Sequence, residues 1–133
     1  MWMLDTNICI SLIKLRPPHL LRRVRALSAG ELVVSSITVA ELEYGVAKSQ
    51  RPEENRYALG TFLAPLFVDP FDDEAASAYG RVRVELERAG TPIGANDLLL
   101  AAQALDRQYT FVTNNTREFR RVAGLRVEDW LMD

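Results

Sequence analysis

Short apolar runs alternate along the chain with longer segments in which apolar side chains recur every three or four positions. A run of two to five apolar or β-branched residues between turn-forming or polar residues is typical of a buried strand. Five such runs predict strands at residues 2–4, 32–35, 67–68, 109–113 and 125–127, the last of them at an edge of the sheet.

The longer segments have the periodicity of helices that bury one face. Thr6-Asn7 supplies capping side chains at the first of them, and the consecutive acids at residues 72–74 are typical of a first helical turn. Helices are predicted at residues 8–15, between Pro18 and Gly30, from 38 to 46, from 52 to 66, from 72 to 89 and from 98 to 105, with a loop at 92–96.

The alternation of strands and helices predicts an α/β fold. In this class a mostly parallel sheet, here of four or five strands, is covered by helices on both faces. The chain has 133 residues, which is enough for one domain with a real core and too short for two ordinary ones. We therefore expect a single domain over residues 1–133.

Composition narrows the class of protein. Apolar residues make up 48% of the chain and charged residues 26%, as in ordinary folded proteins. No apolar run approaches the roughly 20 residues of a membrane span, and the N-terminus lacks the features of a signal peptide. A cytoplasmic protein without a membrane partner is expected. One cysteine, Cys9, and one histidine, His19, argue against a zinc site or a thiol nucleophile.

Three acidic residues stand where a short apolar run gives way to a helix: Asp5, Glu41 and Asp97. The carboxyl ends of parallel strands lie along one edge of a sheet, so acids at such places can meet although they are distant in sequence. Two charges about 4 Å apart repel by roughly 4 kcal/mol at an effective dielectric constant near 20. A cluster of three carboxylates therefore needs a divalent cation or a proton.

Hard oxygen ligands with open positions suit Mg²⁺ or Mn²⁺, and nucleic-acid phosphate is the natural substrate of such a site. Taken singly, Asp5 and Asp97 also fit the role of helix N-caps, and Glu41 that of an exposed helical glutamate. The chain has no phosphate-binding G-x-x-x-x-G-K-[ST] or G-x-G-x-x-G motif and no G-x-S-x-G elbow. A phosphotransfer domain built on Asp5 is a weaker alternative, because a neighbouring acid and a suitably placed lysine are missing.

Four segments together resemble a PIN-domain ribonuclease of the VapC toxin type, in order and over essentially the whole chain. They are residues 3–7 (MLDTN), 36–45 (SITVAELEYG), 92–102 (PIGANDLLLAA) and 112–119 (VTNNTREF). The resemblance implies a three-layer α/β/α PIN-like fold and a Mg²⁺- or Mn²⁺-dependent endoribonuclease that cleaves tRNA or another structured RNA. It also implies a VapB-type antitoxin, a homodimer and higher toxin–antitoxin assemblies.

By this resemblance, Asp5, Glu41 and Asp97 fall on the three acidic positions that the family conserves best. Asp5 and Asp97 are expected to bind the metal directly, and Glu41 to bind it or to position the attacking water. The fourth acidic position falls on Asn115, which removes a charge, and Glu118 is a candidate to replace it. Three further polar residues are expected to orient the acids or bound water: Thr6, Asn7 and Thr113.

The loss of an acid at Asn115 leaves a rival hypothesis, a PIN-like module that binds RNA or protein without cutting it. The sequence leaves open which RNA is cut and where, the number of metal ions, the identity of the antitoxin and the dimer interface.

Overall fold

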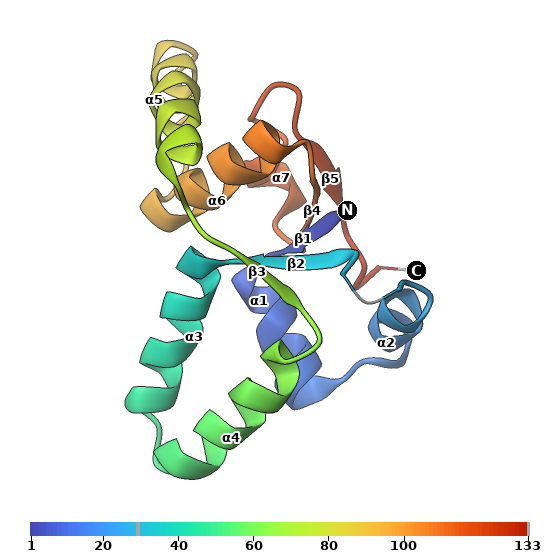
Figure 1. Ribbon diagram of the computed structural model, residues 1–133. Coiled ribbons are helices and arrows are strands. Elements are labelled where there is room, and N and C mark those ends of the chain that lie inside the picture. Colours follow the sequence, from blue (N-terminus) through green and yellow to red (C-terminus); the bar gives the residue numbers. More distant parts are fainter. Residues whose placement is uncertain (29, 133) are drawn as a thin grey trace.

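The computed structural model describes residues 1–28 and 30–132, in which strands and helices alternate along the chain (Figure 1). The strands are β1 (Trp2–Leu4), β2 (Leu32–Ser35), β3 (Phe67–Asp69), β4 (Thr110–Val112) and β5 (Arg126–Glu128). The helices are α1 (Thr6–Ile10), the π-helix η1 (Ser11–Leu15), α2 (Pro18–Arg25), α3 (Ser36–Ala47), α4 (Pro52–Leu63), α5 (Asp73–Arg88), α6 (Ala95–Arg107) and α7 (Thr116–Phe119).

Within the described residues, the strands form one five-stranded sheet in the order β3-β2-β1-β4-β5, and each neighbouring pair is parallel. The register sets Leu4 beside Val112 and Ser35 beside Asp69. The carboxyl ends of the strands therefore lie along one edge, and the residue after β1 is Asp5. The predicted α/β class and mostly parallel sheet are confirmed.

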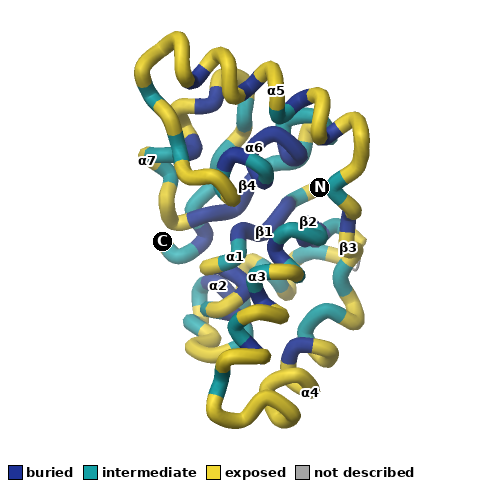
Figure 2. Tube along the Cα trace, turned by 90° about the vertical axis from the view of Figure 1, so that its left-hand side faces the viewer, coloured by how far each residue is buried: buried dark blue, intermediate teal, exposed yellow. Residues whose placement is uncertain are grey.

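Each face of the sheet carries its own hydrophobic core, which confirms the three-layer arrangement. Successive strand residues point to opposite faces, so Met3 and Leu4 enter different cores. One core contains residues of α5, α6 and α7, and the other contains residues of α1, η1, α3 and α4 (Figure 1). Burial is deepest in the central strands and α6, whereas α4 and α5 are largely exposed (Figure 2).

Three predicted helix starts were wrong, two of them because a polar residue at the end of a strand caps the helix directly. Helix α1 begins at Thr6 and is capped by Asp5, and α3 begins at Ser36 and is capped by Ser35 instead of beginning at Thr38. Helix α6 begins at Ala95, so part of the predicted loop is helical and Asp97 lies inside the first turn. The short helix α7 was not predicted. Helix α2 ends at Arg25, and Ala29 and Asp133 lie outside the described residues.

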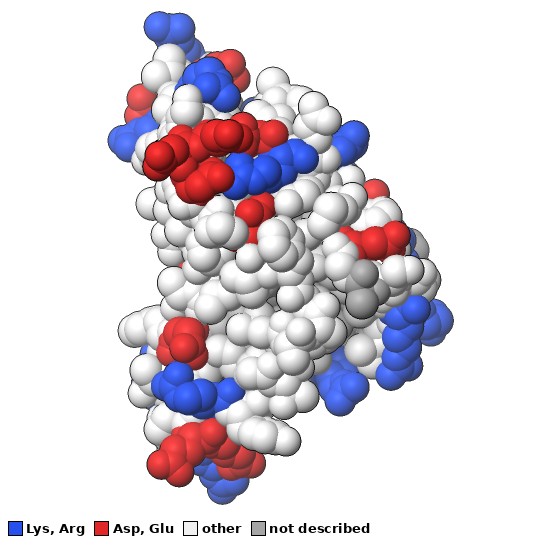
Figure 3. All heavy atoms as spheres, in the orientation of Figure 1, with Lys and Arg blue, Asp and Glu red and all other residues white. Residues whose placement is uncertain are grey.

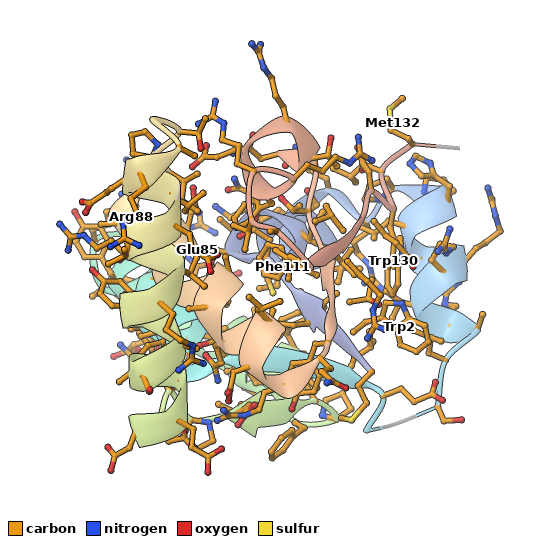
Figure 4. The ribbon with its side chains drawn as sticks, turned by 90° about the horizontal axis from the view of Figure 1, so that it is seen from above. Trp2, Glu85, Arg88, Phe111, Trp130 and Met132 are labelled. Atoms are coloured by element: carbon orange, nitrogen blue, oxygen red, sulfur yellow. The ribbon has the colours of Figure 1, made fainter. Side chains whose placement is uncertain are left out.

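The C-terminal segment packs against the start of the chain. The rings of Trp2 and Trp130 lie 6.3 Å apart beside α2 (Figure 4), and the guanidinium of Arg23 lies 5.0 Å from the Trp130 ring. Arg23 also forms an ion pair with Glu128 in β5. These contacts join the edge strand to α2. Among the helices of the described residues, none has the length and apolar character needed to cross a membrane.

A buried glutamine joins α6 to the strand ends. Gln103 is fully buried; its amide oxygen accepts a hydrogen bond from the Ser35 hydroxyl at 2.6 Å, and its amide nitrogen donates to the Asp69 carbonyl at 3.0 Å. Ser35 also accepts from the backbone N–H of Ile37. The Gln103 amide fixes α6, and with it Asp97, against the ends of β2 and β3.

The substitution Gln103→Leu is expected to lower the free energy of unfolding by about 1–3 kcal/mol, because it leaves buried polar partners on Ser35 and Asp69 without their bonds. Urea denaturation measures this change. The control Gln50→Leu alters an exposed glutamine and should stay within about 0.5 kcal/mol of the unmodified protein. Equal losses in the two variants would contradict the role assigned to Gln103.

Candidate active site

Asp5 lies at the carboxyl end of the central strand and is almost completely buried. One carboxylate oxygen accepts a hydrogen bond from the backbone N–H of Thr6 at 2.7 Å, as an N-cap does. The other accepts from the hydroxyl of Thr113, also at 2.7 Å, from the end of the neighbouring strand β4. One oxygen of the Asp5 carboxylate therefore caps helix α1, and the Thr113 hydroxyl orients the other.

Glu41 reaches the same region from the second turn of α3. Its carboxylate accepts a hydrogen bond from the hydroxyl of Thr6 at 2.8 Å, and that hydroxyl lies 3.1 Å from the hydroxyl of Thr38. Thr6 thus contacts Asp5 through its backbone and Glu41 through its side chain. Through these two hydrogen bonds, Thr6 connects two acids that are 36 residues apart in sequence.

Asp97 lies in the first turn of α6, where the exposed N–H groups of the helix favour a negative charge. The N-cap of α6 is Gly94, so Asp97 is free of the capping role that the sequence allowed for it. A Cβ atom placed on Gly94 would lie 3.4 Å from the Asp97 carboxylate. The loop before α6 therefore passes directly beside the acid.

Glu118, in α7, is held beside Asp97 by two donors. The backbone N–H of Gly94 donates to one of its carboxylate oxygens at 3.0 Å, and the side-chain amide of Asn115 donates to the other at 2.8 Å. Arg121 donates to the Pro92 carbonyl at 2.9 Å and so ties α7 to the same loop. This connection was not predicted, because nothing local in residues 92–94 indicates a contact with residues 115–121.

The electrostatic environment of Asp5, Asp97 and Glu118 includes the charges of the neighbouring acids. Burial, above all, raises the pKa of Asp5 against the opposing hydrogen bonds of Thr113 and Thr6, and the charges of Glu41 and Glu118 raise it further. Burial also raises the pKa of Asp97 to about 7, helped by a hydrogen bond with Glu118 and by the charges of Asp5, Glu118 and Glu41. The backbone N–H of Gly94, followed by smaller contributions from Asn115 and Asp97, lowers the pKa of Glu118 despite partial burial.

With a pKa of about 7, the Asp97 carboxyl is half-protonated near neutral pH, as expected where negative charge is in excess. A divalent cation relieves that excess in place of a proton. In the described part of the chain, no three His, Cys, Asp or Glu side chains are close enough to enclose a metal ion by themselves. Such an arrangement does not suit zinc, but it fits Mg²⁺ or Mn²⁺, which take one or two protein carboxylates and complete their shell with water or phosphate oxygens.

The other residues predicted for the site differ in whether they form hydrogen bonds with the acids. Thr6 and Thr113 hydrogen-bond to the acids, and Asn115 hydrogen-bonds to Glu118. Asn7 is exposed on α1, and within residues 1–28 and 30–132 its side chain forms no hydrogen bond with these acids. Cys9 is fully buried, and burial followed by the charge of Asp5 raises the pKa of its thiol, so it remains an unreactive core residue. The roles of all these residues in metal binding and catalysis remain predictions.

Comparison with known proteins identifies relatives over nearly the full length. The family model described as "PIN domain" matches residues 2–125. The chain is similar to the tRNA(fMet)-specific endonuclease VapC of Shigella flexneri, with 46% identity over 129 residues that cover 97% of each protein.

Two solved structures resemble the chain closely. A chain of DNA-bound VapBC from Salmonella typhimurium has a TM-score of 0.93 and 44% identity, covering 97% of both chains. A chain of VapBC2 from Rickettsia felis, bound to a DNA fragment from the promoter, has a TM-score of 0.90 and 39% identity, covering 97% of this chain and 98% of that one.

The raised pKa of Asp97 predicts how the stability of the metal-free protein depends on pH. A carboxyl whose folded-state pKa is about 7, above its ordinary 3.8, stabilises the fold fully at pH below 4 and loses that contribution as the pH rises through 7. Asp97→Asn mimics the protonated form. Its Tm should therefore rise relative to the unmodified protein by a few degrees between pH 4 and 7.

Thermal unfolding in a metal chelator measures this difference. Asp73→Asn removes an exposed acid in the first turn of α5 and serves as the matched control, whose difference in Tm should not change between pH 4 and 7. The pKa assigned to Asp97 is wrong if the Asp97→Asn difference is equally flat over this range.

Proposed function

The chain belongs to the PIN domain family, and from this membership and its clustered carboxylates we propose that it is a metal-dependent endoribonuclease, the toxin of a VapBC toxin–antitoxin pair. The observation that carries the proposal is the meeting of Asp5, Glu41, Asp97 and Glu118, which come from four separate segments, at the carboxyl edge of the sheet. The proposal treats residues 1–133 as one domain acting in the cytoplasm, where its RNA substrate is found.

Asp5 and Asp97 would hold Mg²⁺ or Mn²⁺, and Glu41 would either complete the set of ligands or accept the proton of the attacking water. When bound, the cation stabilises negative charge on the scissile phosphate and lowers the pKa of a bound water. Thr113 and Thr6 hold Asp5 and Glu41 in fixed orientations, which reduces the reorganisation needed during the reaction. Because a water molecule attacks, the reaction needs no protein nucleophile.

The proposed substrate is tRNA, since a relative that is 46% identical is named as a tRNA(fMet)-specific endonuclease. The chain has a net charge of −2, yet residues 6–30 contain five Lys or Arg and no Asp or Glu. Figure 3 shows basic side chains gathered in separate groups, one of them over α2, instead of in one continuous field. Such local groups of arginine suit contacts with individual phosphates.

The proposed protein partners are a VapB-type antitoxin and a second copy of this chain. The similar chains from Salmonella typhimurium and Rickettsia felis are both described in VapBC assemblies with DNA. By analogy, the antitoxin would restrain the nuclease, and the toxin–antitoxin complex would bind its own promoter as a higher assembly.

Glu118 would supply the fourth negative charge that Asn115 lacks. Its carboxylate is oriented toward Asp97 by the Gly94 N–H and by Asn115, so the asparagine supports the replacement acid instead of competing with it. A phosphotransfer role for Asp5 has less support, because the residues beside it in sequence, Leu4 and Thr6, supply neither a second acid nor a lysine.

Purified protein, freed of antitoxin, should cleave tRNA from a pool of cellular RNA when Mg²⁺ or Mn²⁺ is present, and chelation should stop the cleavage. Asp5→Asn and Asp97→Asn should each lower the rate at least a hundredfold, because each removes a proposed metal ligand. Asp73→Asn is the matched control and should retain the rate. Sequencing of the products identifies the RNA and the cleavage position. Binding of RNA without cleavage would instead favour the non-catalytic module.

Glu118→Gln is expected to weaken Mn²⁺ binding roughly 10- to 100-fold, as loss of a charge beside a metal site does. Asn115→Ala should weaken it by a smaller factor, because it frees Glu118 without removing its charge. Isothermal titration calorimetry measures the affinity independently of cleavage. Glu85→Gln, an exposed position on α5, is the control. An affinity unchanged by Glu118→Gln would exclude Glu118 as the fourth acid.

A further inference from the structure

A half-open cleft of about 200 Å³ lies next to the acid cluster, between the second half of α5 and the beginning of α6. Its lining is mostly apolar and includes Leu86, Ile93 and Leu98, with Tyr79 as an aromatic wall and with Arg83 and Glu87 at the rim. Sites for drug-sized ligands usually exceed about 300 Å³. A cleft of this size therefore suits a single flat ring system.

The cleft and the acid cluster share the loop and first turn of α6. Ile93 and Ala95 line the cleft, whereas Gly94 between them donates its N–H to Glu118. Likewise Leu98 lines the cleft, and its neighbour Asp97 belongs to the cluster. The two sites lie on different sides of one helical turn, whose diameter with side chains is roughly 10 Å. An RNA strand whose phosphate lies at the acids can therefore reach the cleft with a nearby base.

The polar groups at the rim are arranged around the aromatic ring. The guanidinium of Arg83 lies 6.0 Å from the centre of the Tyr79 ring, donates to the Tyr79 hydroxyl at 2.9 Å and pairs with Glu87 at 3.3 Å. Single-stranded RNA is recognised by stacking of unpaired bases on aromatic rings and guanidinium planes, with hydrogen bonds to the base edges. An apolar cleft with one cation and one carboxylate at its rim provides these elements together.

We propose that this cleft binds one nucleobase of the RNA substrate, close to the scissile phosphate, through stacking on Tyr79 and Arg83. The Glu87 carboxylate accepts a hydrogen bond from an exocyclic amino group of that base, as acidic side chains do with cytosine. The inference rests on the proposed ribonuclease function and adds to it a position at which the enzyme reads its substrate.

The test compares Tyr79→Leu and Glu87→Gln with two matched controls that lie outside the cleft, Tyr57→Leu on α4 and Glu85→Gln on α5. Glu85 lies on α5 (Figure 4) and is not among the residues that line the cleft. The substrates are single-stranded RNA oligonucleotides that span the cleavage site, each with one base removed or replaced by a base without an amino group. The readouts are kcat/KM and, in chelator, the affinity of the same oligonucleotides measured by fluorescence anisotropy.

Tyr79→Leu should lower kcat/KM and affinity roughly 10- to 100-fold, as expected for the loss of one stacked base. This loss should disappear on the one oligonucleotide that lacks the recognised base. Glu87→Gln should lose discrimination at that same position while both controls retain it. These effects on a single nucleotide position distinguish base binding from a general loss of structure.

Equal losses on every oligonucleotide, or no loss at all, would overturn the proposal. A change in oligomeric state or in antitoxin binding with RNA recognition intact would assign the cleft to a protein partner instead, and would also overturn it. If the unmodified chain cleaves no RNA, the ribonuclease proposal fails. In that case anisotropy measurements on the same variants, with single-stranded RNA oligonucleotides of defined sequence, decide by themselves whether the cleft binds a base.

Discussion

The chemistry of this protein depends on the burial of several carboxylates that a parallel sheet brings together at one edge. Asp5 follows the central strand, and helices α3 and α6 bring Glu41 and Asp97 to the same place. The sheet and its two cores hold these groups together, and burial first, then the neighbouring negative charges, raise the pKa of Asp97. The protein therefore carries a local excess of negative charge that a proton or a cation must neutralise, and this requirement connects the fold to metal-dependent chemistry.

The polar residues around the acids determine which way each carboxylate faces. Thr113 reaches Asp5 from the adjacent strand, and Thr6 connects Asp5 to Glu41. On the opposite side, Gly94 and Asn115 orient Glu118. The Thr113 hydroxyl, the Thr6 hydroxyl and the Gly94 N–H each come from a different segment than the acid that they bind. The Thr6 N–H and the Asn115 amide instead lie close in sequence to Asp5 and Glu118. The site is consequently sensitive to the relative placement of the central strands, α6 and α7, and not only to the four acids.

A second set of buried polar contacts fixes α6 against the sheet. Gln103 binds Ser35 and the Asp69 carbonyl, and at the end of the helix Arg107 pairs with Asp69, Asp72 and Asp106. Figure 3 shows acidic and basic atoms side by side on the surface near the start of α5. Because α6 is anchored at its middle and its C-terminal end, its first turn can present Asp97 to the acids and Leu98 to the neighbouring cleft without shifting.

The sequence by itself determined the α/β class, the order of the strands and helices along the chain, and the candidates Asp5, Glu41 and Asp97. Apolar periodicity and residue type are local properties, so they can be read without coordinates. Only the tertiary structure decided that Glu118 joins the cluster, that Asn115 supports it, and that Asn7 is exposed without a hydrogen bond to the acids among the described residues. Gly94 and Glu118 meet because α7 folds back onto the loop before α6. Such a contact cannot be predicted from the apolar periodicity of either segment. The order of the strands in the sheet, and the burial of Gln103 among apolar neighbours, were decided in the same way, by which elements pack together.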